Sequence, residues 1–456
     1  MERTEKNRYV NERIGIKTKL AYGGANFGGN LVYATISSFA TYYYTDNVGI
    51  AAAVVGTMML LARFIDGISD IVMGSIIDKT HTKIGQARPW FIASIIPLAV
   101  SLILIFSVPD SLSAQGKIVY MYATYIFSAV ICYTANSLSA VAMQSLMTGN
   151  VKERMGLNAF YQMFGFISVV AINMVTSNIA GIIGWQKLTW CYALLSMVLL
   201  GLAAILCKER KHESSVKTSD AEKKTASFKA ALPVLIKSRY FYIILVLAIC
   251  NYIAIGTFNA GGIYYAQYIL GNPGLFGLMT LSSMLPAVIF TNIVPKITMK
   301  IGQKKMILMG YLLQTCGYIF VSAANTKLPV LLAGQVLTGL GTASVAGLLI
   351  PTIGEVIRYY ELTKGMHLDG VLNSIATLGL KIGTGLGSAF VGWILAFGGY
   401  VNGAAQQSAS ALIAMRTLVG FIPLACAVTG ILMTLGLDIE KRLRDTQKSL
   451  KEDGEK

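Results

Sequence analysis

Long runs of hydrophobic residues alternate with short polar segments along almost the whole chain. About twelve of these runs reach the ~20 residues that an α-helix needs to cross a bilayer. The pattern therefore predicts an all-α membrane protein with twelve transmembrane helices. We expect the first six helices near residues 18–44, 51–77, 89–109, 117–147, 156–182 and 186–207, and the last six near 238–268, 273–294, 306–324, 328–357, 370–396 and 407–437.

One interior segment, residues 208–237, is polar and divides the chain into two halves. A short repeat indicates that the halves are duplicates, because residues 83–88 (KIGQAR) return as residues 300–305 (KIGQKK), each after the second helix of its half. Duplicated halves are typical of secondary transporters that bind their substrate near the membrane midplane. The predicted parts are an N-terminal six-helix bundle at 1–207, a cytoplasmic linker at 208–237, a C-terminal six-helix bundle at 238–437 and a cytoplasmic tail at 438–456.

The composition and the placement of charge agree with a membrane protein. Hydrophobic residues make up 54% of the 456 residues and charged residues only 13%, which is too little charge for a soluble surface. The net charge of +16 does not indicate nucleic acid, because Lys and Arg gather in alternate loops. This positive-inside pattern predicts a multi-pass protein of the inner or plasma membrane, with both termini in the cytoplasm and the lipid bilayer as its surroundings. The tyrosines at 42–44, before Asp46, would then form an aromatic belt at the outer interface.

Three charged residues interrupt the second hydrophobic run. Asp66 and Asp70 are four residues apart and share one helix face, and Arg63 lies close to that face. An Asp at the bilayer centre costs about 2.5–3.5 kcal/mol to insert, so the two carboxylates need a function. At low dielectric they need a cation between them or a proton on one of them. The pattern predicts a sodium or proton site; the alternative is a structural ion pair in which Arg63 neutralises one Asp.

Other polar residues also lie on hydrophobic helices. Lys381 is about ten residues from either end of its helix, too far for its amine to reach the interface, so it faces either the carboxylates or an anionic or hydroxylated ligand. Asn26, Asn30 and Gln162 carry amides, which bind sugar hydroxyls well. Amides also join helices within membranes, and both interpretations stay open for these three.

The loop after the second helix resembles the signature of the major facilitator superfamily, with Gly74, Asp78, Lys83, Gly85 and Arg88 in its roles. In that superfamily the cluster latches the cytoplasmic side by pairing its Asp with a helix end and basic partners. A plain basic turn that fixes orientation is the alternative, and both can hold. A counterpart in the second half is expected at the end of the tenth helix. The predicted gating residues are Arg63, Asp78, Lys83, Arg88, Glu355 and Arg358.

A denser likeness covers about the first 90 residues. It is carried by Lys19, Tyr22, Gly23, Asn26, Phe27, Gly28, Asn30, Tyr42, Asp46, Gly49, Val55, Gly56, Thr57, Ala62, Arg63, Asp66, Asp70, Met73 and Gly74. This set resembles the glycoside–pentoside–hexuronide:cation symporters, a family of the major facilitator superfamily. The likeness is thinner afterwards, with residues 152–154 and Lys381 as landmarks. It implies the major facilitator fold, with two six-helix halves.

The resemblance also implies site residues. For the cation these are Asp66 and Asp70, with a sodium ion as the possible metal, and Ser69 and Thr134 as secondary oxygens. For the sugar they are Asn26, Asn30, Ser137, Gln162, Thr377 and Lys381. The chain departs from the family where a helix-four Asp and a helix-five Arg are replaced by Ser137 and Gln162. With those clamps absent and Lys381 kept, an anionic sugar such as a hexuronide becomes attractive.

The sequence thus predicts a secondary active symporter that couples sodium or proton influx to uptake of a glycoside, pentoside or hexuronide by alternating access. We expect a monomer that binds a small-molecule sugar, uses no cofactor beyond the coupling ion and has no nucleic-acid partner. The sequence has no Walker A motif, nucleophile–base set or metal cluster, which argues against an ATP-driven pump and against an enzyme or sensor. A carrier of a non-sugar amphiphile or drug on the same fold is the alternative.

Overall fold

The computed structural model of the protein describes residues 13–209, 238–364 and 369–454, so the predicted linker at 208–237 falls almost entirely outside the described residues. The chain forms two compact units. Unit 1 is Met1–Glu213 together with Ala266–Gly277 and Gly399–Gln407. Unit 2 is Ser214–Tyr265, Leu278–Gly398 and Ser408–Lys456. Two short segments from the second half of the sequence therefore belong to unit 1.

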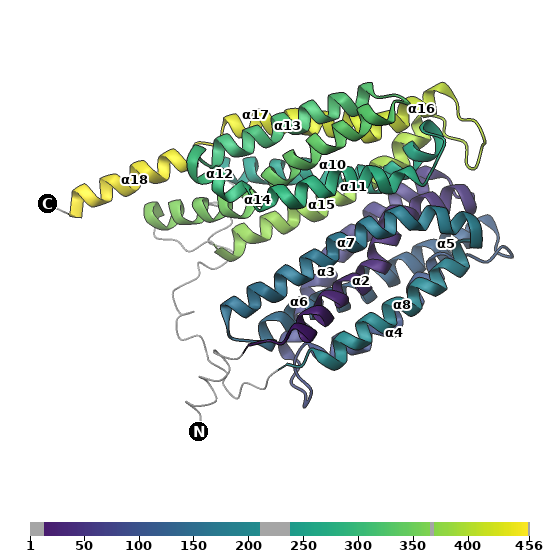
Figure 1. The fold of residues 1–456 in the computed structure, drawn as a ribbon, viewed down its shortest axis with the longest axis horizontal. Coiled ribbons are helices and arrows are strands. Elements are labelled where there is room, and N and C mark those ends of the chain that lie inside the picture. Colours follow the sequence, from purple (N-terminus) through teal and green to yellow (C-terminus); the bar gives the residue numbers. More distant parts are fainter. Residues whose placement is uncertain (1–12, 210–237, 365–368, 455–456) are drawn as a thin grey trace. The chain divides into compact units, whose positions relative to one another are not determined.

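Unit 1 contains the helices of the first half (Figure 1). Its predicted fourth helix is one span made of two α-helices around a π-helical segment. Polar side chains begin several helices; Asn150, for example, accepts hydrogen bonds from the backbone N–H groups of Lys152 and Glu153 at the start of α7. The elements are α2 (Ile16–Tyr42), η1 (Tyr43–Asn47), α3 (Ala52–Lys79), α4 (Arg88–Ile105), α5 (Ala114–Ile126), η2 (Phe127–Tyr133), α6 (Thr134–Met147), α7 (Val151–Ile183) and α8 (Trp185–Leu206).

Unit 2 repeats the order of long helices, and a π-helical segment again follows its first helix. Its second helix is bent by 58° where α11 gives way to α12. The elements are α10 (Arg239–Tyr264), η3 (Tyr265–Ile269), α11 (Leu275–Thr291), α12 (Val294–Ile301), α13 (Gln303–Ala323), α14 (Leu328–Lys364), α15 (Asp369–Phe397), α16 (Ala409–Arg416), η4 (Thr417–Phe421), α17 (Ile422–Leu435) and α18 (Ile439–Gly454); η3 and the start of α11 lie in the part assigned to unit 1.

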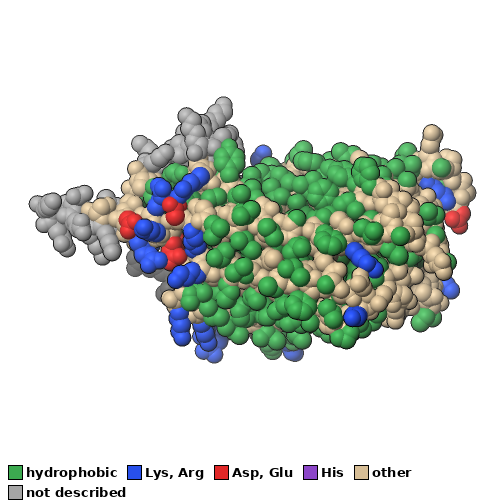
Figure 2. All heavy atoms as spheres, turned by 90° about the horizontal axis from the view of Figure 1, so that it is seen from above, with side chains coloured by type: hydrophobic (Ala, Val, Ile, Leu, Met, Phe, Trp, Pro, Cys, Tyr) green, Lys and Arg blue, Asp and Glu red, His purple; other side chains and the backbone are tan. Residues whose placement is uncertain are grey.

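The predicted all-α membrane architecture is confirmed for the described residues. Nine of their helical segments are long and apolar enough to cross a membrane, or ten if the bent pair α11–α12 is one span. The helices α2 and α3 are 27 and 28 residues long but carry the polar and charged residues of the candidate site. The number reaches twelve only if these two helices and the bent pair are all counted as spans, so the count of twelve stays a prediction. In the face drawn in Figure 2, hydrophobic side chains predominate between the ends, and Lys and Arg gather mainly toward one end.

Small residues allow the helices of each unit to approach closely, as is common in membranes. In unit 1, a Cβ atom added at Gly28 of α2 would lie 3.1 Å from Leu200 of α8. In unit 2, a Cβ atom at Gly387 of α15 would lie 2.7 Å from the carbonyl oxygen of Ile253 in α10. The glycines near residue 385 therefore serve helix packing.

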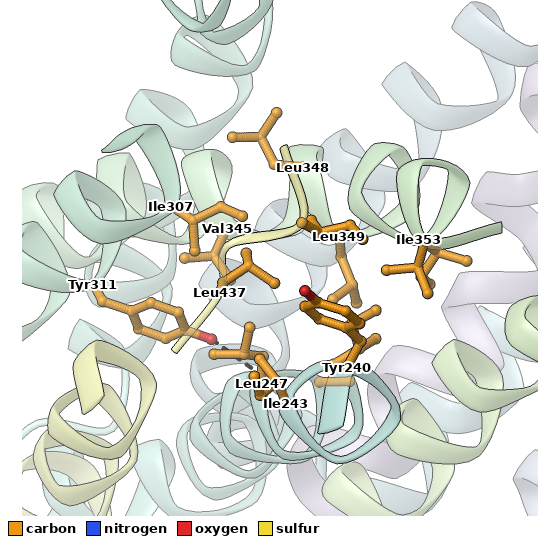
Figure 3. Close-up of a cluster of buried hydrophobic side chains, with 14 of the residues drawn as sticks. Tyr240, Ile243, Leu247, Ile307, Tyr311, Val345, Leu348, Leu349, Ile353 and Leu437 are labelled. Atoms are coloured by element: carbon orange, nitrogen blue, oxygen red, sulfur yellow. Dashed lines mark hydrogen bonds between the residues drawn. The ribbon is translucent and has the colours of Figure 1, made fainter. Parts of the chain in front are cut away.

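The core of unit 2 consists mainly of apolar side chains, and a hydrogen bond joins two of its residues. Side chains from α10, α13 and α14 converge in a buried cluster, shown in Figure 3. Tyr311 is 1% exposed, and its hydroxyl donates to the backbone oxygen of Leu247 at 3.2 Å. A buried phenol needs such a partner, because an unpaired hydroxyl would lose its hydrogen bonds to water.

Candidate functional site

Oxygen atoms from α3 and α6 come together around Asp66. Asp66 is 9% exposed, and the hydroxyl of Thr134 donates to its Oδ1 at 3.0 Å. The hydroxyl of Ser69 lies 3.1 Å from the backbone oxygen of Asp66 and 3.3 Å from Oγ1 of Thr134. Asp70 lies one turn further along α3 and is partly buried. The structure thus gathers three of the four predicted cation-binding residues by direct contact, with Asp70 on the same helix.

A π-helical segment places Thr134 in this cluster. The segment η2 ends at Tyr133, and α6 begins at Thr134. Because each π-turn contains an extra residue, the helix face changes there, and such segments are common at functional sites. Thr134 is 2% exposed and is therefore held by the packing around it.

Arg63 lies beside the carboxylate without forming a close ion pair. Its Nη1 is 4.0 Å from Oδ2 of Asp66, and its Nη2 donates to the hydroxyl oxygen of Tyr33 at 3.3 Å. The guanidinium also lies 5.6 Å from the centre of the Tyr33 ring. Tyr33 in turn stacks on Tyr133, with ring centres 4.5 Å apart. The arginine is thus held from the tyrosine side, at the outer limit of an ion pair with Asp66.

The amides predicted on α2 make contact with α7. Nδ2 of Asn26 donates to the backbone oxygen of Tyr161 at 2.6 Å, and Nδ2 of Asn30 donates to Oδ1 of Asn26 at 3.2 Å. Asn26 therefore joins two helices, whereas Asn30 lies at the end of this chain of hydrogen bonds. A Cβ atom at Gly165, one turn after Gln162, would lie 2.5 Å from Nδ2 of Asn26 and 3.5 Å from Nδ2 of Asn30, so this glycine leaves room for both amides.

The other predicted sugar residues occupy two units. Gln162 is exposed on α7, and Ser137 is partly buried on α6. The hydroxyl oxygen of Ser137 lies 3.5 Å from the backbone oxygen of Thr134. Thr377 and Lys381 lie on α15 in unit 2, four residues apart, so they share one helix face. Thr377 is exposed and Lys381 is partly buried.

The basic turn between α3 and α4 is held by a carboxylate that the sequence interpretation missed. Glu209, just after α8, accepts hydrogen bonds from the backbone N–H groups of Gln86 at 2.5 Å, of Ala87 at 2.9 Å and of Arg88. The Arg88 guanidinium donates to the backbone oxygen of Ala204 at 2.7 Å. A negative charge is favoured at this position because the first N–H groups of α4 point toward it.

The corresponding turn before α13 is built in the same way. The N–H group of Gln303 donates to Glu440 at 3.2 Å, and Lys304 Nζ donates to the backbone oxygen of Leu435 at 2.7 Å. Gly302 has a φ of 90°, a conformation that favours glycine. The repeat between residues 83–88 and 300–305 therefore has a matched structure, and each clamping Glu follows the last long helix of its half.

The predicted gating residues take different positions. Asp78 and Lys83 are exposed, and the described contact of Asp78 is its backbone oxygen, which accepts from Nε2 of Gln86 at 3.2 Å. Arg358 is exposed, and Oε2 of Glu355 is buried without a hydrogen-bond partner among the described residues. In unit 2 the carboxylate that clamps the turn is Glu440. The gating roles of Glu355 and Arg358 stay predictions.

A second cluster at the far end of α2 was also missed. Asp46, in η1, accepts hydrogen bonds from the hydroxyls of Tyr268, of Tyr400 at 2.6 Å and of Thr45 at 2.7 Å. Asn402 donates to the backbone oxygen of Ile50 at 3.1 Å. These bonds hold the segments Ala266–Gly277 and Gly399–Gln407 within unit 1. The sequence signal is a carboxylate at the end of a run of tyrosines, a pattern that predicts an aromatic belt but not this cluster.

Comparisons with known proteins agree in their description. Residues 21–441 match the family described as MFS/sugar transport protein. The chain is 30% identical to the isoprimeverose transporter of Lactiplantibacillus pentosus, covering 89% of this chain and 85% of that relative. It is 25% identical to the glucuronide carrier protein homolog of Escherichia coli, covering 91% and 90%. Its fold is similar to that of a variant of the nucleoside transporter NupG, with a TM-score of 0.66 at 12% identity over 91% of this chain and 99% of that chain.

Proposed function

This chain belongs to the MFS/sugar transport protein family, and on that premise we propose that it is a symporter that couples sodium or proton influx to sugar uptake. The family was predicted from the resemblance of the first 90 residues to the glycoside–pentoside–hexuronide:cation symporters, and the comparisons confirm it. The chain is thus a multi-pass membrane transporter and not an enzyme. We further propose that it acts as a monomer, with both termini in the cytoplasm.

The single observation that carries the proposal is the oxygen cluster around Asp66. The hydroxyl of Thr134 lies within hydrogen-bonding distance of the Asp66 carboxylate and of the Ser69 hydroxyl, and Asp70 follows one turn later. Oxygen donors suit a hard cation such as sodium, and a buried carboxylate can also take up a proton. Nη1 of Arg63 lies 4.0 Å from Oδ2 of Asp66, at the outer limit of an ion pair.

We propose that the sugar contacts within unit 1 are Asn26, Asn30, Ser137 and Gln162. Thr377 and Lys381 on α15 are proposed separately, as the contacts that unit 2 offers. Amide and hydroxyl side chains can form hydrogen bonds with sugar hydroxyls. A positively charged lysine within the membrane favours a sugar that carries a carboxylate. The relatives are named for isoprimeverose and for glucuronides, so these two sugars are the first substrates to test.

In this proposal, the binding of the cation and the binding of the sugar are coupled through the charge on Asp66 and Asp70. A bound cation neutralises the carboxylates and raises the affinity for sugar, and the loaded protein then changes its access from one side to the other. The coupling free energy is reciprocal and typically about 1–3 kcal/mol, so the sugar must raise the affinity for the cation by the same factor.

Uptake by membrane vesicles tests the proposal. Vesicles that contain the protein are given labelled isoprimeverose or methyl glucuronide under an inward gradient of sodium or of protons. We expect accumulation with one gradient in the wild type, and none in Asp66→Asn or Asp70→Asn, because each variant loses a carboxylate of the cation site. Asp445→Asn, at an exposed position on α18, is the matched control. Accumulation by both site variants equal to the wild type would reject the mechanism.

The same assay distinguishes the alternative carrier of an amphiphile or drug. That alternative gains support from the absence of the charged clamps at Ser137 and Gln162. It requires that neither sugar stimulates cation uptake, whereas symport requires that one of them does.

A further inference from the structure

A cavity of about 840 Å³ lies in unit 1, at the ends of α2 and α4 and at the junction of α7 and α8. None of the residues that line it belongs to the cation site or to the sugar site assigned above. We propose that this cavity, called the outer pocket below, is a second sugar site that takes a neutral glycoside. The proposal rests on the proposed function and on its orientation, which places these helix ends on the external side.

Aromatic rings form one wall of the outer pocket. Trp185, at the first position of α8, is partly buried and stacks on Phe106, with ring centres 5.4 Å apart and an interplanar angle of 15°. Tyr43 meets Trp185 edge-on at 5.9 Å, and Tyr42 lies 6.4 Å from it. Rings that neighbours hold in place offer a large apolar contact at a low cost in conformational entropy. The C–H face of a pyranose fits such a wall.

Polar groups that suit sugar hydroxyls line the rest of the outer pocket. The amides of Asn47, Gln186 and Gln267 each offer two donors and one acceptor. The hydroxyl oxygen of Ser107 is buried and has no hydrogen-bond partner among the described residues. A buried hydroxyl normally has a partner, and a sugar hydroxyl in the pocket would supply one. The volume also lies within the about 300–1,000 Å³ that is usual for small-molecule sites.

The charge of the outer pocket favours a neutral ligand. Asp110 lines it, and the described lining residues include no Lys or Arg. A carboxylated sugar or an anionic lipid headgroup would therefore meet a negative charge without a compensating positive one. Lys381 on α15 is positively charged and favours a carboxylated sugar instead. The outer pocket and the transport site thus differ in the sugars that they favour.

Tryptophan fluorescence of the full-length protein in nanodiscs tests the outer pocket. The protein has four Trp residues, so the response of Trp185 is the part of the sugar-induced change that disappears in Trp185→Phe, a substitution that keeps an aromatic ring. We expect isoprimeverose to give a saturable response, and methyl glucuronide to give a weaker one. Gln267→Ala and Ser107→Ala should each weaken the binding of isoprimeverose about 3- to 10-fold, because each removes a hydrogen bond to the sugar. Gln115→Ala, an exposed amide on α5, should leave it unchanged.

The transport site is removed in a separate variant. In Asn30→Ala/Gln162→Ala we expect uptake to fall while the Trp185 response to isoprimeverose remains. Loss of that response in this variant would assign it to the transport site and overturn the proposal, as would the absence of any response of Trp185 in a wild-type protein that takes up the sugar. Absence of uptake in the wild type, by contrast, would reject the proposed function and leave the binding measurement to decide on the outer pocket alone.

Discussion

The hydroxyl of Thr134 offers the sharpest test of the cation site, because the effect of its removal differs between the two coupling ions. It is 2% exposed and donates to Oδ1 of Asp66 at 3.0 Å. Its oxygen has lone pairs that can face a cation while its O–H donates to the carboxylate. Thr134→Ala removes one candidate oxygen ligand and the hydrogen bond that orients another.

The expected magnitude follows from these two losses. In a sodium-coupled carrier, removal of a group that orients a metal ligand typically lowers metal affinity about 10- to 100-fold, so half-maximal uptake should require that much more sodium. In a proton-coupled carrier, the loss removes a donor that stabilises the charged carboxylate, and hydrogen bonds to charged groups contribute about 1.5–3 kcal/mol. The dependence of uptake on pH should then change, while sodium should still have no effect.

Initial rates of sugar uptake in vesicles, measured against sodium concentration and against pH, distinguish these outcomes. Thr134→Ser keeps the hydroxyl and should retain most of the wild-type behaviour. Thr429→Ala, at a partly exposed position on α17 whose hydroxyl bonds only within its own helix, is the control for loss of a threonine in a membrane helix. If Thr134→Ala showed wild-type dependence on both ions, the assignment of this oxygen cluster to the coupling ion would be wrong.

Three further predictions concern the groups around the site. Tyr33→Phe should weaken the activation of uptake by the cation, because Arg63 loses its hydrogen-bond acceptor and can approach Asp66. Uptake measured against cation concentration tests this. Tyr133→Phe, which keeps the ring stack, is the control. Glu209→Gln should lower the stability of the purified protein by about 1.5–3 kcal/mol, measured by thermal unfolding, because three N–H groups lose a charged acceptor. Asp46→Asn should speed hydrogen exchange of residues 399–407, measured by mass spectrometry, because Tyr400 loses its charged acceptor; unchanged exchange would contradict a tethering role.

The fold was largely predictable because the bilayer imposes strong constraints on sequence. A spanning helix must satisfy its backbone hydrogen bonds internally and must be apolar over about 20 residues, so the hydrophobic runs mark its position. The duplicated turns at 83–88 and 300–305 were also legible, since glycine is needed where φ is positive, as at Gly302. The π-helical segments were not predictable, because hydrophobic periodicity does not distinguish one extra residue in a turn within an apolar run.

The candidate site was predictable in its charges but not in its partners. Asp66 and Asp70 stand out because a carboxylate is costly in a membrane. Glu209, Glu440 and Asp46 do not stand out in the sequence, because they lie at helix ends, where charged residues are common. Their roles depend on which backbone N–H groups or tyrosine hydroxyls the fold brings to them, and those groups are up to 354 residues away for Asp46.

The position of Arg63 explains how one helix can hold a permanent cation and a transported one side by side. If Arg63 paired closely with Asp66, the coupling ion would have to displace it, and binding would be weakened by the cost of breaking a buried ion pair. The hydrogen bond to Tyr33, and the stack of Tyr33 on Tyr133, keep the guanidinium 4.0 Å from the carboxylate instead. The same residue Tyr133 ends η2 and directly precedes Thr134, which donates to Asp66. The π-helical segment thus carries the ring that stacks on Tyr33 and ends directly before the residue whose oxygen faces Asp66, so a change in the shape of that segment would alter both together.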